Sequence, residues 1–191
     1  MNINPTTVLR INKEDFNGIS IEERDTVGKI NVRGKSSDKE FMKNIGSALD
    51  LVLPVEPNVR VSNNNISIVW LSPNEWLVET PKDKTQDILV LLKSTLNPQK
   101  TAVTDVSFNR SVLRLEGDSV FTLLSKYLVL NLEDILKTNH SVAQTIFIKI
   151  PILIIRNNSD NKTTSIDIHV NRSHTKYVYD LLVDGCKILN I

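Results

Sequence analysis

The chain has 191 residues, 40% of them hydrophobic and 24% charged, and its 23 basic and 22 acidic side chains give a formal net charge of +1. This composition is typical of a globular protein with one domain, or with two small subdomains that share a core, and it excludes a disordered chain. The balanced charge gives no excess of basic residues that would indicate binding to nucleic acid. The single cysteine, Cys186, excludes a disulfide framework and a multi-thiolate metal site.

No segment is predicted to direct secretion or to enter a membrane. Residues 1–5 lack the charged and apolar stretches of a signal peptide. The longest apolar run, 146–155, is interrupted by Lys149 and Pro151 and falls short of the roughly 20 apolar residues that a membrane-spanning helix requires. We therefore expect a cytoplasmic protein with neither a membrane nor a nucleic acid as partner.

The chain opens with a polar segment that contains Pro5. We expect residues 1–15 to form an arm on the surface of a single domain, residues 16–191. Apolar and polar residues then alternate over 16–24 and 27–33, which predicts two strands joined as a hairpin.

A helix is predicted next, because Ser37 and Glu40 have the spacing of a capping box. The helix extends to about Leu51 and is stopped by the prolines that follow. Three strands separated by short polar turns come after it, over 58–62, 66–71 and 75–80. A second helix begins at Asp83, and its expected buried stripe is Ile88, Leu91, Leu92 and Leu96.

Strand-like runs over 101–107 and 110–116 flank a polar turn and predict another hairpin, with Asp105 and Arg110 on opposite sides of the turn. A short helix capped by Asp118 is expected to follow.

The last third of the chain is strand-forming over 141–155, where Pro151 marks an edge or a bulge, and again over 163–170. Ser173 is then expected to cap a final helix. The inward-facing positions expected in that helix are Val178, Leu181, Leu182 and Cys186.

This order of elements predicts an α+β fold with mainly antiparallel sheets. Two or three strands precede each helix, and the short connections favour hairpins over long crossovers. The blocks 59–96 and 142–189 share a plan of strands, a polar turn, a strand and a closing helix. We therefore expect the fold to be pseudo-duplicated.

No residue pattern indicates a self-contained active site. The six glycines form no dinucleotide-binding or triphosphate-binding loop, and His140, His169 and His174 lack partners at metal-ligand spacing. His169 alternates with apolar neighbours, so we expect it on the opposite side of a strand, in solvent or at an interface. Cys186 lies in an apolar helix, where cysteine behaves as a small hydrophobe. We predict no catalytic residue and no metal site in this chain.

Asp105 has two interpretations. It either accepts hydrogen bonds from the ring N–H groups of a ligand such as a pterin, or it orders its own turn and pairs with Arg110 or Arg114. The second is favoured, because turn aspartates commonly bond local backbone amides.

The two tryptophans, Trp70 and Trp76, also have two interpretations. They either form a binding platform or serve as core or interface anchors, as large aromatic side chains in strands usually do. Glu75 precedes Trp76 and is expected to be a turn residue and not an acid catalyst.

With these residues in view, the sequence resembles the gamma subunit family of heterotetrameric sarcosine oxidases. The segments that carry the resemblance occur in the family's order from about residue 50 onward. They are Leu-x-Leu-Pro-x-x-Pro-Asn at 51–58, Trp-Leu-Ser-Pro-Asn-Glu-Trp-Leu at 70–77, Thr-Asp-Val-Ser-x-Asn-Arg-x-x-x-Arg-Leu at 104–115, Gln-Thr at 144–145, Val-Asn-Arg-Ser at 170–173 and the helix 177–182. The resulting structural or interface candidates are Trp70, Glu75, Trp76, Asp105, Arg110 and Arg172.

The resemblance implies a subunit of an oxidoreductase complex that demethylates sarcosine to glycine, with formaldehyde or methylene-tetrahydrofolate and hydrogen peroxide as products. It implies alpha, beta and delta subunits as partners, chiefly alpha. It assigns FAD, FMN, NAD, zinc, tetrahydrofolate and the active site to those other subunits, which leaves this chain a non-catalytic structural role. It also implies a fold similar to the folate-binding domain of the glycine-cleavage T-protein family, in agreement with the pseudo-duplication.

Two other functions stay open. The chain could be a free-standing folate-binding or aminomethyltransferase-like protein in which Asp105 holds the pterin, although such enzymes carry further domains. Titration with tetrahydrofolate distinguishes this function from the structural one. The third is a generic protein-interaction module of the same fold.

Overall fold

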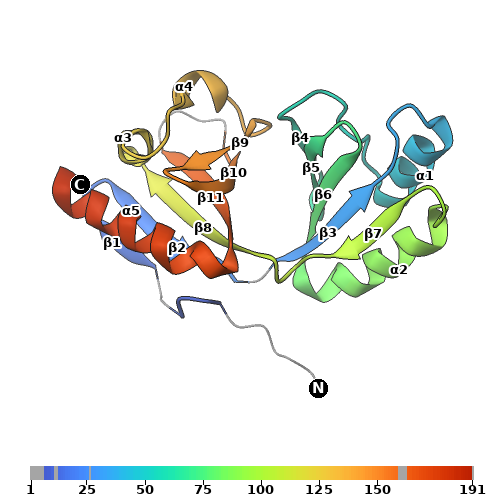
Figure 1. Cartoon of the computed structure of the whole chain (residues 1–191), viewed down its shortest axis with the longest axis horizontal. Helices are drawn as coiled ribbons and strands as arrows, with labels where there is room; N and C mark the ends of the chain where they lie inside the picture. Colours follow the sequence, from blue (N-terminus) through green and yellow to red (C-terminus); the bar gives the residue numbers. More distant parts are fainter. Residues whose placement is uncertain (1–6, 11–12, 26, 159–162, 191) are drawn as a thin grey trace. The chain divides into compact units, whose positions relative to one another are not determined.

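The computed structural model describes residues 7–10, 13–25, 27–158 and 163–190 (Figure 1). The contacts divide the chain into two compact units, which we call unit 1 (residues 1–26 and 108–191) and unit 2 (residues 27–107). Each unit has one antiparallel sheet, with its helices packed on one face. The predicted α+β class is thus confirmed, and the single domain over 16–191 stays a prediction.

Unit 2 contains one five-stranded sheet with the strand order β4-β5-β6-β3-β7. Its elements are β3 (Gly28–Arg33), α1 (Lys39–Leu49), β4 (Arg60–Ser62), β5 (Ser67–Ser72), β6 (Glu75–Thr80), the 3₁₀ turn η1 (Lys82–Lys84), α2 (Thr85–Thr95) and β7 (Ala102–Asp105). Its core forms where α1 and α2 cover alternate side chains of the central strands β3 and β6.

Unit 1 contains a six-stranded sheet with the strand order β1-β2-β8-β11-β10-β9. Its elements are β1 (Glu14–Phe16), β2 (Ile19–Glu23), β8 (Arg110–Gly117), α3 (Val120–Ser125), α4 (Leu132–Ile135), β9 (Val142–Phe147), β10 (Ile150–Arg156), β11 (Thr164–Asn171), the 3₁₀ turn η2 (Arg172–His174) and α5 (Thr175–Leu189). Leu9 packs against the core of this unit, and the carboxylate of Glu23 accepts hydrogen bonds from the amides of Val8 and Leu9 at 2.9 and 2.6 Å. Most of the expected arm, residues 1–15, lies outside the described residues.

The two units repeat one plan, which confirms the predicted pseudo-duplication. The sheet order β9-β10-β11-β8-β2 of unit 1 matches β4-β5-β6-β3-β7 of unit 2. The plan ends in a helix that follows a 3₁₀ turn, α2 in unit 2 and α5 in unit 1. The first residue of each helix is a buried threonine whose hydroxyl donates to the carbonyl four residues earlier, Thr85 to Pro81 at 3.2 Å and Thr175 to Asn171 at 3.4 Å. The units differ in the chain position of the fifth strand. In unit 2 this strand, β7, follows the closing helix, whereas in unit 1 it is β2 and comes before the other four strands of the plan.

Both predicted hairpins that span the unit boundaries are wrong. The run 16–24 does not pair with 27–33, because β2 pairs with β1 and β8, whereas β3 pairs with β6 and β7. The run 101–107 likewise does not pair with 110–116. Alternation identifies a half-buried strand but carries no information about its partner, and here the chain passes from one sheet to the other at each expected turn.

Helix starts differ from the predictions by one or two residues. Asp38, not Ser37, caps α1, and its carboxylate accepts hydrogen bonds from the amides of Glu40 and Phe41 at 3.0 and 3.2 Å. In α2 the buried apolar positions are Leu89 and Leu92, with the following Leu96, while Leu91 is exposed.

Candidate functional site

A cluster of buried charge lies on the face of the unit 1 sheet opposite to its helices. Side chains alternate along β8 and β11, so Leu113 and Ile168 face the core, whereas Arg114 and Asp167 face away from it. These two residues are direct partners in the antiparallel register. Asp167 is only 4% exposed, and a buried carboxylate requires a compensating partner.

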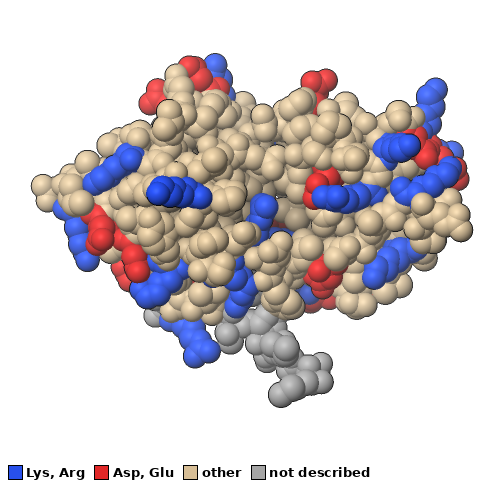
Figure 2. All heavy atoms as spheres, viewed as in Figure 1, with Lys and Arg blue, Asp and Glu red and all other residues tan. Residues whose placement is uncertain are grey.

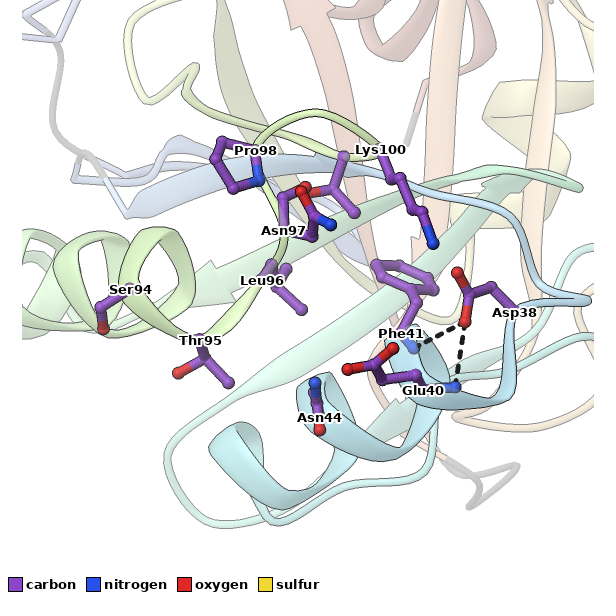
Figure 3. A pocket seen from close by; sticks show the side chains of 11 residues that line it. Asp38, Glu40, Phe41, Asn44, Ser94, Thr95, Leu96, Asn97, Pro98 and Lys100 are labelled. Carbon is purple, nitrogen blue, oxygen red and sulfur yellow. Dashed lines mark hydrogen bonds between the residues drawn. The ribbon is translucent and has the colours of Figure 1, made fainter.

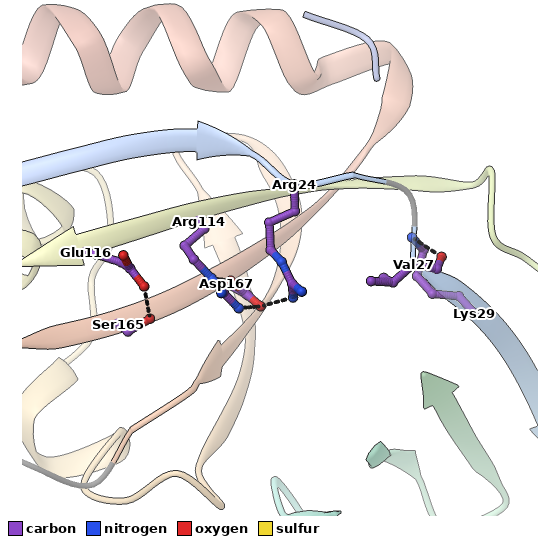
Figure 4. A network of polar contacts seen from close by, with 7 residues as sticks. All are labelled: Arg24, Val27, Lys29, Arg114, Glu116, Ser165 and Asp167. Carbon is purple, nitrogen blue, oxygen red and sulfur yellow. Dashed lines mark hydrogen bonds and ion pairs between the residues drawn. The ribbon is translucent and has the colours of Figure 1, made fainter. Parts of the chain in front are cut away.

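Two arginines bind the carboxylate of Asp167 (Figure 4). Arg114 donates from Nε and Nη2 at 2.8 and 2.9 Å, and Arg24, which directly follows β2, donates from Nη1 at 3.0 Å. Burial alone raises the pKa of Asp167, but the hydrogen bond and charge of Arg114 and the charge of Arg24 outweigh it and bring the pKa below its ordinary value. A carboxylate held in this way is a poor proton acceptor, so the cluster is suited to joining β2, β8 and β11 and not to acid–base catalysis.

The same face carries a second polar pair and a histidine. Ser165 donates to a carboxylate oxygen of Glu116 at 3.0 Å, next to the arginine cluster. His169 lies on this face, as its alternation predicts, but it is 1% exposed and does not lie in solvent; its register partners on the neighbouring strands, Val112 and Leu153, are buried as well. Across the described ranges, no three His, Cys, Asp or Glu side chains lie together so that they could hold a metal ion.

The tryptophan segment of unit 2 lies partly in its core. Trp76 is 0% exposed, packs against Phe41 with ring centroids 5.6 Å apart, and faces Trp70 across the pair β5–β6. Trp70 is half-buried at the edge of this core. Glu75 is the first residue of β6 and accepts hydrogen bonds from Asn31 at 2.7 Å and Arg33 at 2.8 Å. The segment therefore packs its second tryptophan inside the unit and leaves the first partly accessible.

Asp105 is exposed at the end of β7 and orders its own turn. One carboxylate oxygen accepts hydrogen bonds from the amide and the hydroxyl of Ser107, at 2.9 and 2.6 Å. The Ser107 hydroxyl in turn accepts from the amide of Lys29 at 3.0 Å, which ties the turn to β3. Arg114, one expected partner of Asp105, bonds Asp167.

The structure brings together the two Asn-Arg pairs of the family resemblance. Arg110 is opposite Asn171 in the register of β8 and β11, and the amide of Arg172 donates to the carbonyl of Asn109 at 3.2 Å. Both arginines are half-buried at this end of the sheet. The sequence alone does not indicate this proximity, because α3, α4, β9 and β10 lie between β8 and β11 in the chain.

A pocket of about 310 Å³ opens between the start of α1 and the end of α2 (Figure 3). Asp38, Glu40 and Lys100 supply its charges, and Phe41 forms part of its wall. The Asp38 carboxylate caps α1, and Phe41 belongs to the core of unit 2. The pocket thus combines structural residues with solvated charges, and it places no nucleophile beside a general base.

One face of the molecule carries mixed charge. On the face shown in Figure 2, lysine and arginine side chains are interspersed with acidic ones. In the described part of the chain, none of the helices is long and apolar enough to cross a membrane.

Cys186 is fully buried in α5, and burial raises the pKa of its thiol to about 11.

The family model described as "Sarcosine oxidase, gamma subunit family" matches residues 33–187. A comparison with curated proteins finds no match. Among solved structures, the chain is similar to a heterotetrameric sarcosine oxidase from Corynebacterium sp. U-96 in complex with pyrrole 2-carboxylate, with a TM-score of 0.79 and 21% identity. That match covers 91% of this chain and 86% of the other.

The chain is also similar to the glycine cleavage system aminomethyltransferase T from Bartonella henselae, with a TM-score of 0.63 and 13% identity. This match covers 87% of this chain but only 45% of the aminomethyltransferase. The two structures establish the predicted similarity in fold to the glycine-cleavage T-protein family.

Proposed function

Because this chain belongs to the sarcosine oxidase gamma subunit family, we propose that it is the gamma subunit of a heterotetrameric sarcosine oxidase and supports the assembly of that complex. The observation that carries the proposal is the family match over 33–187, and the shared fold over nearly the whole chain supports it. The complex is an oxidoreductase that acts on the CH–NH group of sarcosine and yields glycine, together with formaldehyde or methylene-tetrahydrofolate and hydrogen peroxide.

The chain acts in this complex without a catalytic residue of its own. The surroundings of three potentially reactive side chains support this assignment. The Asp167 carboxylate accepts hydrogen bonds from two arginines, the Asp105 carboxylate accepts hydrogen bonds from Ser107, and the Cys186 thiol is buried, which raises its pKa. FAD, FMN, NAD, zinc and tetrahydrofolate accordingly bind to the other subunits.

The partners are the alpha, beta and delta subunits, and chiefly alpha. Of the six structural or interface candidates, Asp105 is exposed and Glu75 is half-buried, and the partly accessible tryptophan and arginine side chains among them are Trp70, Arg110 and Arg172. Arginine and tryptophan are enriched among the residues that dominate binding energy at protein interfaces, which supports their selection.

Co-expression with the alpha, beta and delta subunits of the same organism tests the proposal. We expect this chain to co-elute with them in size-exclusion chromatography. We also expect its omission to lower flavin loading or sarcosine oxidation by the remaining subunits. A chain that elutes alone, beside a fully active complex of the other subunits, would contradict the proposal.

A further inference from the structure

The strand β7 forms one edge of the unit 2 sheet, next to α2 (Figure 1). In the described part of the chain its sheet neighbour is β3 alone. Three of its four residues are exposed, Ala102, Thr104 and Asp105, and Val103 is half-buried. An edge strand presents a row of backbone N–H and C=O groups, which is a template for pairing with another strand.

The register defines which backbone groups of β7 face outward. The amide of Val106 donates to the carbonyl of Lys29 at 2.8 Å, and these two residues lie opposite each other one step beyond the paired residues of β7 and β3. From this hydrogen-bonded pair onward, every second residue of β7 bonds β3. The intervening residues, Val103 and Asp105, direct their N–H and C=O groups away from the sheet. These groups have no hydrogen-bond partner among the described residues.

A pocket of about 250 Å³ lies beside Val103, on the face of the sheet that the helices cover. Leu96, Pro98, Thr101 and the stem of Lys93 complete its lining, which is mainly apolar. A residue opposite Val103 on an added strand directs its side chain to the same face of the sheet. That side chain would enter the pocket, and an apolar one matches the lining.

Asp105 determines which second side chain an added strand needs. It is two residues from Val103 along β7 and faces the same side of the sheet. One of its carboxylate oxygens accepts both hydrogen bonds from Ser107, and the other has no hydrogen-bond partner among the described residues. Because cross-strand pairs of opposite charge stabilise a sheet, a basic residue suits the position opposite Asp105.

A second copy of this chain does not supply these side chains from its described edge strands. Two copies of β7 that pair antiparallel through their outward groups place Asp105 opposite Val103, Thr101 or a second Asp105, none of which is basic. The other edge strands, β1, β4 and β9, contain no basic residue two positions before an apolar one. We therefore expect the added strand to come from a different protein.

We propose that an extended segment of a partner subunit pairs antiparallel with β7. It places a basic side chain next to Asp105 and, two residues later, an apolar side chain in the pocket beside Val103. The outward backbone groups supply affinity in this mode of recognition, and the pocket and the charge supply specificity. The identification of the partner as another subunit of the complex rests on the proposed function.

Amide hydrogen exchange in the isolated chain and in the reconstituted complex tests the proposal. In the isolated chain, we expect the outward amides of Val103 and Asp105 to exchange fast and the inward amides of Ala102 and Thr104 to exchange slowly. In the complex, we expect the outward amides to slow by about 100-fold while the inward ones change little. Fast outward exchange in an intact complex would overturn the proposal.

A matched pair of variants tests the charge. Asp105→Asn removes the charge and keeps an oxygen that accepts the hydrogen bonds of Ser107. We expect it to bind the partner subunits about 5-fold more weakly at low salt and as the wild type does at high salt. Asp87→Asn, at an exposed position of α2, changes the net charge equally and should bind as the wild type does. Equal binding by both variants at low salt would contradict a basic partner residue.

A second pair of variants separates backbone pairing from the side chain of Val103. Val103→Pro removes an outward N–H that β3 does not use, whereas Val103→Ala keeps it, and both remove the valine side chain. We expect the proline variant to bind the partner subunits about 10-fold more weakly than the alanine variant. Equal affinities would contradict strand addition, and the exchange experiment decides if the proline variant does not fold.

The outcomes also separate this proposal from the proposed function. A complex that assembles with unprotected outward amides overturns strand addition and leaves the gamma-subunit assignment in place. A chain that joins no complex overturns both. Protection that appears in the isolated chain and increases with its concentration identifies a second copy as the occupant and overturns the choice of partner.

Discussion

The indole N–H of Trp76 donates a hydrogen bond to the carbonyl of Pro54 at 2.8 Å, and the side chain of Trp76 is fully buried. This bond joins the segments 51–58 and 70–77, which both carry the family resemblance. Leu53, next to Pro54, is also buried, so the loop after α1 is anchored to the core of unit 2 by two consecutive residues. A buried carbonyl that is left without a hydrogen-bond donor destabilises the folded state. Substitution of Trp76 should therefore lower the stability of unit 2.

Trp76→Phe is therefore expected to lower the free energy of unfolding by about 2 kcal/mol, through the lost hydrogen bond and the unfilled volume. Trp70→Phe is the matched control, because Trp70 is half-buried and its indole N–H has no hydrogen-bond partner among the described residues. We expect less than about 1 kcal/mol for the control. Urea titration followed by circular dichroism measures both, and equal losses would contradict the role of the Pro54 contact.

Asp167→Asn removes the charge that Arg114 and Arg24 bind, and we expect a loss of about 3 kcal/mol at pH 7. The folded-state pKa of Asp167 lies below its ordinary value, so the unfolded chain takes up a proton first as the pH falls. The stabilisation is complete above the unfolded pKa of about 4 and is lost as the pH falls through the folded pKa. The difference between wild type and variant should thus shrink below about pH 4.

Unfolding titrations at several pH values measure that difference. Asp180→Asn provides the control, because Asp180 forms an exposed ion pair with Lys176 on α5 at 2.7 Å. Such pairs contribute about 0.5 kcal/mol or less. A pH-independent difference for Asp167→Asn would show that the charge of Asp167 does not stabilise the fold.

Local sequence patterns were sufficient to locate most strands but not to pair them. β6 was predicted with its observed limits, 75–80, because alternation and the flanking turn are local properties. The pairing of β2 with β8 joins residues about ninety positions apart, and nothing in either strand specifies it. Prediction of a hairpin between neighbouring strands therefore failed at both points where the chain changes units.

The candidate site was predictable only in part, for the same reason. An aspartate between Ile166 and Ile168 in an alternating strand indicates a polar position on the face away from the core, so Asp167 had a recognisable signal. Arg114 belonged to the family resemblance. Arg24 could not be connected to Asp167, because 143 residues separate them and their contact depends on the sheet order.

The thiol of Cys186 is expected to be unreactive in the native chain. Burial raises its pKa to about 11, so at pH 8 only about one molecule in a thousand carries a thiolate, which is the reactive form. Labelling with a disulfide reagent should proceed at the rate of unfolding and become fast in denaturant. Because this is the only cysteine, the signal has one source. Rapid labelling of the native chain would contradict its burial in α5.

Ile148, in the turn between β9 and β10, has φ +59°, a conformation that is unusual for a β-branched residue. Ile148→Gly is expected to raise the free energy of unfolding of the isolated chain by up to about 1 kcal/mol, because glycine adopts a positive φ without the penalty of a β-branched side chain. Ile146→Gly is the matched control, since Ile146 is similarly exposed but lies in a regular strand. There glycine should destabilise by about 1 kcal/mol. Thermal unfolding of both variants measures the difference, and destabilisation by Ile148→Gly would show that the turn is not strained.

Tetrahydrofolate is expected not to bind the isolated chain through Asp105. One oxygen of this carboxylate already accepts two hydrogen bonds from Ser107, and the side chain is exposed and does not line the pocket between α1 and α2. Both tryptophans lie in unit 2 with Asp105, so their fluorescence is a suitable reporter. We expect no change up to millimolar ligand after correction for its absorbance. A binding isotherm that disappears in Asp105→Ala but persists in Asp118→Ala, an exposed aspartate of unit 1, would instead support folate binding.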